Sequence, residues 1–140
     1  MSIAIYPALV FTVALLVTTA YFLMGGLPLL VLDHDTSLDA RFVRGFFNLY
    51  YKAAFITAVG ASVSYAGLGR ASFAIGAAAL AGSVVLLRRK LIPTMDQLGA
   101  QIQASAPRAL RRFRQVHAVA LFLNLVQLVL LVWALTLFSL

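Results

Sequence analysis

The sequence predicts an all-α integral membrane protein that folds as a four-helix bundle. Four long apolar stretches, at residues 8–32, 46–68, 71–87 and 118–138, follow one another within 140 residues. Each is close to the length of about 20 residues with which a helix crosses a bilayer. Hydrophobic residues make up 63% of the chain and charged residues only 11%, which is far from the composition of a water-soluble domain. Residues 1–140 are therefore expected to form a single transmembrane domain.

The positively charged residues predict how this bundle is oriented. Arg41, Arg44 and Lys52 lie between the first stretch and the start of the second, whereas the connection between the second and third stretches has only Arg70. The connection between the third and fourth stretches has seven basic residues, which we also expect to contact anionic phospholipid: Arg88, Arg89, Lys90, Arg108, Arg111, Arg112 and Arg114. Lys and Arg concentrate in cytoplasmic loops. The first connection and this long basic third connection are therefore predicted to be cytoplasmic, and both termini periplasmic.

The first apolar stretch is expected to be retained as a span. No basic residue precedes it, and it is longer than the cleaved core of a signal peptide. Near its end, Gly25, Gly26 and Pro28 predict a kink or an early loosening of the helix. The second helix is expected to begin ahead of its apolar stretch, at about residue 37, because Thr36 and Asp39 have the spacing of a capping box.

The second and third stretches are rich in small residues, as in Ala53-Ala54, Gly60-Ala61 and 76–79. In lipid, small residues allow two helix backbones to approach closely. These two spans are therefore predicted to pack as a tight hairpin across the short turn at residues 67–70.

The third connection has a helical pattern of its own. Four apolar residues recur in it at spacings of four, three and four: Leu91, Met95, Leu98 and Ile102. This pattern predicts either an amphipathic helix on the cytoplasmic surface or a continuation of the third helix past Pro93. Pro107 suits the first turn of the last helix.

Two histidines and two aspartates are the candidate ligands of a metal or cofactor. Asp33, His34 and Asp35 follow the first stretch, and His117 opens the last stretch on the same predicted side. Imidazole and carboxylate groups suit a divalent metal such as zinc or iron, and paired histidines in a helical bundle can hold haem. Ordinary ion pairs between the aspartates and nearby arginines are the interpretation that we favour. No metal, haem or other cofactor is therefore predicted.

The last stretch carries an intramembrane polar face. His117, Asn124 and Gln127 are separated by seven and three residues and so lie on one side of a helix. Buried amides avoid lipid, so Asn124 and Gln127 should face protein. The simplest interpretation is hydrogen bonding across the bundle. The alternative is a polar lining for a quinone head group, a small substrate or a proton path.

Other functions are disfavoured by what the chain lacks. It has no cysteine, which excludes disulfides and thiolate metal sites. No charged residue lies near the middle of a predicted span, which argues against an ion-coupled transporter. There is no phosphate-binding glycine motif and no Ser-His-Asp arrangement, so no catalytic residue is predicted. We also expect no nucleic-acid partner.

Four short motifs are distributed along the chain: Arg41-Phe42-Val43-Arg44, Ile92-Pro93-Thr94-Met95-Asp96, Phe113-Arg114-Gln115-Val116-His117 and Asn124-Leu125. Together they resemble a family of small bacterial four-span membrane proteins. The layout is also similar to that of the anthrone-oxygenase-like four-span group. The first resemblance implies an inner-membrane protein without an assigned reaction. The second implies a cofactor-free oxygenase for aromatic, quinone-like compounds, with His117 and Asn124 as pocket residues.

The leading functional hypothesis is a non-catalytic accessory or assembly subunit of a larger membrane protein complex. The small size, the small-residue helix faces and the lack of a catalytic set favour it. The first alternative is a membrane enzyme or a cofactor- or quinone-binding protein with a site at the cytoplasmic rim, and the second is a component of a small-molecule transporter. The expected location is the bacterial inner membrane, with lipid and other membrane protein subunits as partners.

Overall fold

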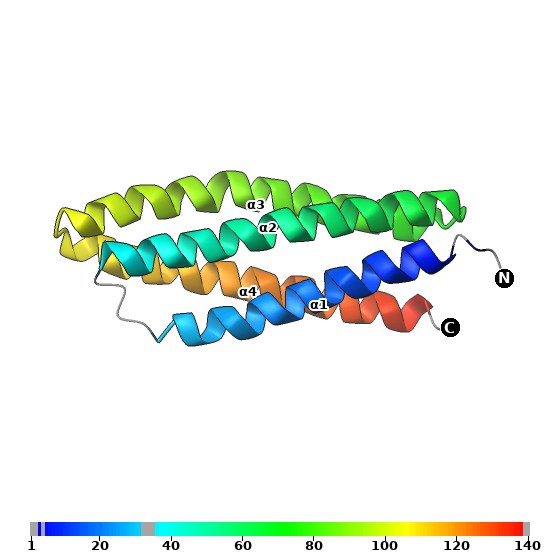
Figure 1. Cartoon of the computed structure of the whole chain (residues 1–140), viewed down its shortest axis with the longest axis horizontal. Coiled ribbons are helices and arrows are strands. Elements are labelled where there is room, and N and C mark those ends of the chain that lie inside the picture. The colour runs from blue at the N-terminus through cyan, green and yellow to red at the C-terminus, as the bar shows by residue number, and fades with distance from the viewer. Residues whose placement is uncertain (1–2, 4, 32–35, 139–140) are drawn as a thin grey trace.

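The computed structural model describes residues 3, 5–31 and 36–138. In this part of the chain all regular structure is helical: α1 (Ile5–Leu29), α2 (Ser37–Gly67), α3 (Ala71–Gln103) and α4 (Pro107–Phe138), shown in Figure 1. The predicted all-α class is therefore confirmed. α1, α3 and α4 are each long and apolar enough to cross a membrane. α2 is as long but is not among the helices that meet this criterion, and it carries Lys52 together with several tyrosine and serine residues.

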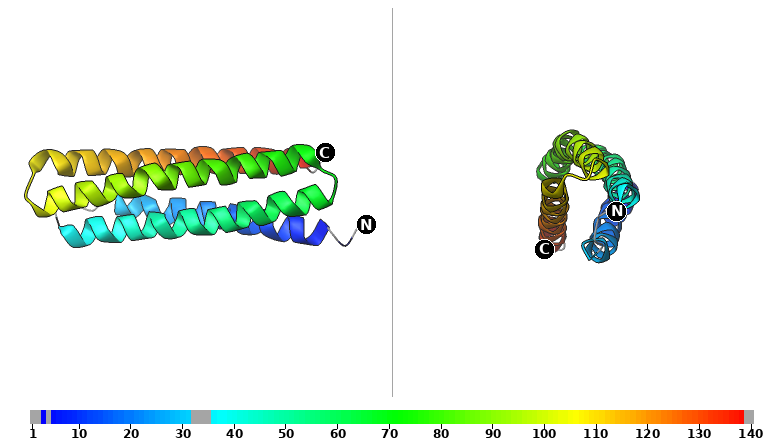
Figure 2. Two further views of the ribbon diagram at one scale, coloured as in Figure 1. Left: turned by 90° about the horizontal axis from the view of Figure 1, so that it is seen from above. Right: turned by 90° about the vertical axis from the view of Figure 1, so that its left-hand side faces the viewer.

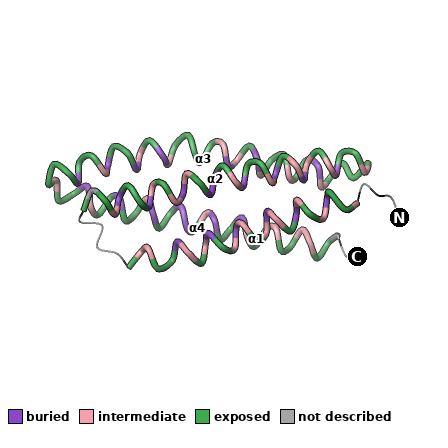
Figure 3. Tube along the Cα trace, viewed as in Figure 1, coloured by how far each residue is buried: buried purple, intermediate pink, exposed green. Residues whose placement is uncertain are grey.

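The four helices form a bundle in which each helix packs against its neighbours in the sequence. α2 lies between α1 and α3, and α4 packs against α3 (Figure 2). A smaller contact joins α4 to α1. The start of α1 and the end of α4 lie at one end of the bundle, and the α3–α4 connection lies at the other. Buried residues recur along all four helices on the sides that face one another (Figure 3).

The predicted hairpin of the second and third helices is confirmed, because α2 and α3 make the most extensive contact in the bundle. Ala54 and Ala58 of α2 and Ala81 of α3 are buried members of the main core. The hydroxyl of Ser62 also donates to the backbone carbonyl of Ala74 across the interface, at 2.8 Å. Several other small residues of α3 do not enter the interface and are exposed: Gly76, Ala78, Ala79 and Gly82.

The predicted start of α2 is also confirmed. The side chain of Thr36 accepts a hydrogen bond from the backbone amide of Asp39 at 3.2 Å, which satisfies one of the free amides of the first turn. At the end of α1, the helix continues through Gly25 and Gly26 to Leu29, three residues short of the predicted apolar stretch. The two glycines allow close packing, because a Cβ atom at Gly26 would overlap the side chain of Leu121 in α4.

The prediction of a long third connection is wrong. α3 runs past Pro93 to Gln103 and α4 begins at Pro107, so the connection is only residues 104–106. The continuation past Pro93, one of the two alternatives for this segment, is the one observed. Its apolar residues explain why it stays helical: Ile92, Met95, Leu98 and Ile102 are buried in the core. The seven basic residues therefore lie on two long helices, three near the middle of α3 (residues 88–90) and four in the first turns of α4 (residues 108–114), and all are exposed.

Candidate functional site

A cavity of about 550 Å³ lies in the half of the bundle that holds the chain ends. Thr12 and Leu15 of α1 and Ala61 and Tyr65 of α2 contribute to its wall, and the remaining lining residues belong to α3 and α4. Its exposed lining residues are Ser72, Gly76 and Ala79 on α3 and Leu130, Trp133 and Leu137 on α4. The cavity therefore opens sideways, between α3 and α4.

The sequence of α3 explains why this half of the bundle is hollow. From residue 71 to residue 83, α3 consists mostly of alanine, glycine and serine, which fill little space. Beyond this segment larger side chains, such as Val84, Ile92 and Met95, complete the main core. The smaller core cluster at the hollow end contains only Tyr65 and three alanines as buried members. The cavity thus follows from a change in residue size along one helix.

Three hydroxyl groups on the cavity wall, those of Thr12, Tyr65 and Ser83, are already engaged. The Thr12 hydroxyl donates to the backbone carbonyl of Ala8 at 2.7 Å, and its oxygen lies 2.9 Å from the Tyr65 hydroxyl. Because the single Thr12 proton is used, Tyr65 is the donor between these two hydroxyls. Ser83 donates to the carbonyl of Leu80 at 2.7 Å. These groups therefore leave little hydrogen-bonding capacity for a ligand.

Gln127 is a buried cavity residue with hydrogen-bonding capacity to spare. Its side-chain oxygen Oε1 accepts a hydrogen bond of 2.7 Å from the Tyr50 hydroxyl of α2. Its Nε2 amide has no partner among the described residues. The residue is buried from the outside but contributes to the cavity wall. It therefore presents a neutral donor in an otherwise apolar space.

Asn124 lies one turn before Gln127 on α4 and is only 1% exposed. Neither its Oδ1 nor its Nδ2 has a hydrogen-bond partner in the described part of the chain. Both Asn124 and Gln127 are buried inside the bundle. Of these two amides, Gln127 is the one that forms a hydrogen bond to another helix within the described part of the chain.

His117 is fully enclosed by the bundle, on the same side of α4 as Asn124. Its ring meets the ring of Phe47 edge-on, with centroids 5.4 Å apart. The other residues of the predicted rim cluster, Asp33, His34 and Asp35, lie outside the described residues. Among the described residues, no group of three His, Cys, Asp or Glu side chains is placed to hold a metal ion. The favoured interpretation, in which these aspartates form ion pairs and no cofactor is bound, stays a prediction.

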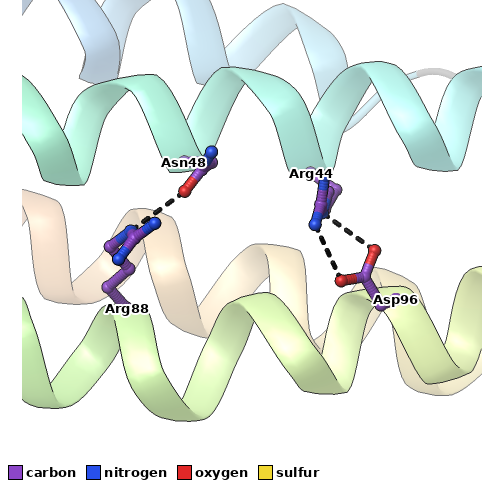
Figure 4. A network of polar contacts seen from close by, with 4 residues as sticks. All are labelled: Arg44, Asn48, Arg88 and Asp96. Atoms are coloured by element: carbon purple, nitrogen blue, oxygen red, sulfur yellow. Dashed lines mark hydrogen bonds and ion pairs between the residues drawn. The ribbon is translucent and has the colours of Figure 1, made fainter.

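Two polar contacts join α2 to α3 at the basic end (Figure 4). Arg44 and Asp96 form a two-pronged ion pair, with Nε 2.8 Å from Oδ1 and Nη2 donating to Oδ2 at 2.9 Å. One turn further along α2, Asn48 accepts a hydrogen bond of 3.0 Å from Nε of Arg88. The side chains of Arg44 and Asp96 are 38% and 52% exposed, so the pair contributes at most about 1 kcal/mol.

The ion pair of Asp96 was not predicted from the sequence. The signal for these contacts in the sequence was the spacing of the polar residues along the two helices. Arg44 and Asn48 are one turn apart on α2, and Arg88 and Asp96 are about two turns apart on α3. Two antiparallel helices bring such positions opposite each other. Recognising this requires knowing that α3 continues beyond Pro93.

Comparisons with known protein families, curated proteins and solved structures give no match. The resemblances to four-span families therefore stay predictions. What the chain itself provides is a helical bundle, a side-opening cavity and one available amide on the cavity wall.

Proposed function

We propose that this protein is a four-span membrane protein that binds a lipophilic small molecule from the bilayer, without catalysing a reaction on it. The observation that carries the proposal is the cavity of about 550 Å³ that opens between α3 and α4. Its size falls within the range of small-molecule sites, about 300–1,000 Å³.

The membrane arrangement supports this function. α1 and α3 are both apolar enough to span, and they run in the same direction along the bundle. A chain that crosses along α1 and again along α3 has to return along α2, so α2 is the fourth span. Lys52, near its middle, would extend its ammonium group toward the interface. The basic residues at 88–90 of α3 and 108–114 of α4 support a cytoplasmic α3–α4 connection and periplasmic termini in a bacterium.

The position of the opening favours a ligand that dissolves in lipid. Leu130, Trp133 and Leu137 flank the opening on α4, and small residues flank it on α3. In a bilayer such an opening faces acyl chains, so a ligand enters from the membrane. The apolar lining stabilises an apolar ligand by burial. The engaged hydroxyls of Thr12 and Tyr65 favour binding over acid–base chemistry.

A saturable photolabelling experiment tests this proposal. The protein is reconstituted in liposomes with an alkyl diazirine that has no hydrogen-bonding group, and cross-links are mapped by mass spectrometry. We expect labelling of the cavity-lining residues that falls when excess unlabelled alkane is added, whereas labelling by bulk lipid does not saturate.

Two neighbouring substitutions provide the matched control. Ala79→Trp places a large side chain in the cavity, whereas Ala78→Trp adds the same side chain at an exposed position that does not line the cavity. We expect the saturable labelling to fall at least tenfold with the first variant and to persist with the second. Equal labelling of both variants would contradict the proposal.

An accessory subunit is the second candidate, and one specific observation favours it. Ala71, Ala78 and Gly82 are exposed on α3, and the last two are one turn apart. Exposed small residues at this spacing allow another transmembrane helix to approach closely. Mild detergent extraction should then recover the chain in a large complex that Gly82→Leu disrupts and Val63→Leu, at an exposed position of α2, does not. A single monodisperse small species would contradict this candidate.

A further inference from the structure

The amide of Gln127 determines which chemical group the cavity can recognise. Tyr50 donates to Oε1 at 2.7 Å and so fixes the orientation of the carboxamide. The NH₂ group then points away from Tyr50 and has no partner among the described residues. Since Gln127 is part of the cavity wall, the cavity contains an oriented hydrogen-bond donor.

The environment makes this donor costly to leave unsatisfied. The described lining residues include no charged side chain, and the hydroxyls of Thr12, Tyr65 and Ser83 are engaged with each other or with backbone carbonyls. An N–H group in apolar surroundings without an acceptor costs free energy. An acceptor on the ligand removes this cost. A carboxylate or phosphate would bring a charge with no cation in the lining to compensate it.

We infer that the ligand is a neutral lipophilic carbonyl compound, such as a long-chain ketone or ester. Its carbonyl oxygen accepts a hydrogen bond from Nε2 of Gln127, and its alkyl chain leaves the cavity between α3 and α4. This inference rests on the proposed function, because it specifies the ligand of the same cavity.

Competition between two molecules that differ in one group tests the inference. The alkyl diazirine labels the reconstituted protein, and 2-tridecanone or tridecane is added as competitor at equal mole fractions in the lipid. One hydrogen bond to a buried donor corresponds to about a tenfold difference in affinity. We therefore expect 2-tridecanone to compete about ten times better than tridecane.

A variant assigns that preference to Gln127. Gln127→Met keeps a side chain of similar length but removes the amide, so we expect both competitors to become equally effective. Tyr50→Phe, which keeps the ring and removes the hydroxyl that orients the amide, should reduce the preference for the ketone. The comparison on the unaltered protein needs no variant and stands even if Gln127→Met fails to fold.

The outcomes separate this inference from the proposed function. The ketone and the alkane could compete equally while labelling stays saturable and is blocked by Ala79→Trp. That result would overturn the inferred ligand class, and the proposed binding site would still stand. A tenfold preference that persists in Gln127→Met would also overturn the inference, because another group would then bind the carbonyl. Labelling that neither competitor reduces would overturn the proposed function itself.

Discussion

Asn124 and Gln127 are two carboxamides on the same face of α4, yet their polar atoms are satisfied differently. Gln127 receives a hydrogen bond from Tyr50, whereas Asn124 is equally enclosed and has no partner in the described part of the chain. Their inward direction was predictable, because amides avoid lipid. The difference between them was not predictable, because the partner of Gln127 lies 77 positions away in the sequence.

Replacing Asn124 by leucine should stabilise the protein. Leucine has the same number and branching of side-chain heavy atoms, and two methyl groups replace an oxygen and a nitrogen that lack partners. Removing a buried unsatisfied amide avoids a desolvation cost of about 1–3 kcal/mol. We expect Asn124→Leu to raise the midpoint of thermal unfolding in mild detergent.

Tyr50→Phe is the opposite case and serves as the comparison. It removes a donor and leaves Oε1 of Gln127 without its hydrogen bond, so the unfolding midpoint should fall. If Asn124→Leu lowered the midpoint as Tyr50→Phe does, the Asn124 amide would have to be making favourable interactions.

At the scale of helices, the close approach of two helix backbones depends on a few glycines, and these glycines differ in how near the side chains of the neighbouring helix lie. In α2, a Cβ atom at Gly60 would overlap the ring of Phe11 in α1, whereas a Cβ atom at Gly45 would meet nothing within 4 Å. Both glycines lie inside the same helix, so their intrinsic cost to helix formation is the same. Only packing distinguishes them.

This contrast predicts opposite effects for the same substitution. Gly45→Ala should stabilise the protein by up to about 1 kcal/mol, because alanine is the better helix former. Gly60→Ala should destabilise it by about 1–3 kcal/mol, because the ring of Phe11 must move away. Unfolding in detergent measures both. A stabilising Gly60→Ala would show that α1 and α2 are not in close contact at this point.

The helix boundaries show how far local sequence patterns were sufficient. The start of α2 and the start of α4 were predicted from Thr36 with Asp39 and from Pro107, because capping and proline preferences act within a few residues. The end of α3 was left open between two alternatives. Proline favours interruption at Pro93, and only the burial of residues such as Met95 against other helices keeps the segment helical.

At the scale of the whole molecule, the number of helices was predictable and the cavity was not. Hydropathy and length are properties of each helix alone. A cavity depends on how two surfaces fail to fill the space between them, as the small residues of α3 do opposite Leu130 and Leu131. The high content of small residues in α3 was visible in the sequence, but it was interpreted as packing surface against α2. Only part of it has that role.

The charge distribution of the whole molecule leads to a topology that can be measured directly. The chain has no cysteine, so single cysteines can be introduced without background. Leu38→Cys at the start of α2 and Ala104→Cys after α3 should react only with reagents that reach the cytoplasm. Arg70→Cys, at the α2–α3 turn, should react from the periplasm. All three positions are exposed.

This set of positions tests α2 as the fourth span independently of its hydropathy. Leu38 lies in the first turn of α2 and Arg70 lies just beyond its end. Labelling of the two positions from opposite faces therefore requires α2 to cross the bilayer. Labelling of both from the same face would leave α2 outside the membrane. The cavity would then lie between helices that do not all span, and its opening would no longer face acyl chains. The proposed route of the ligand through the bilayer depends on this result.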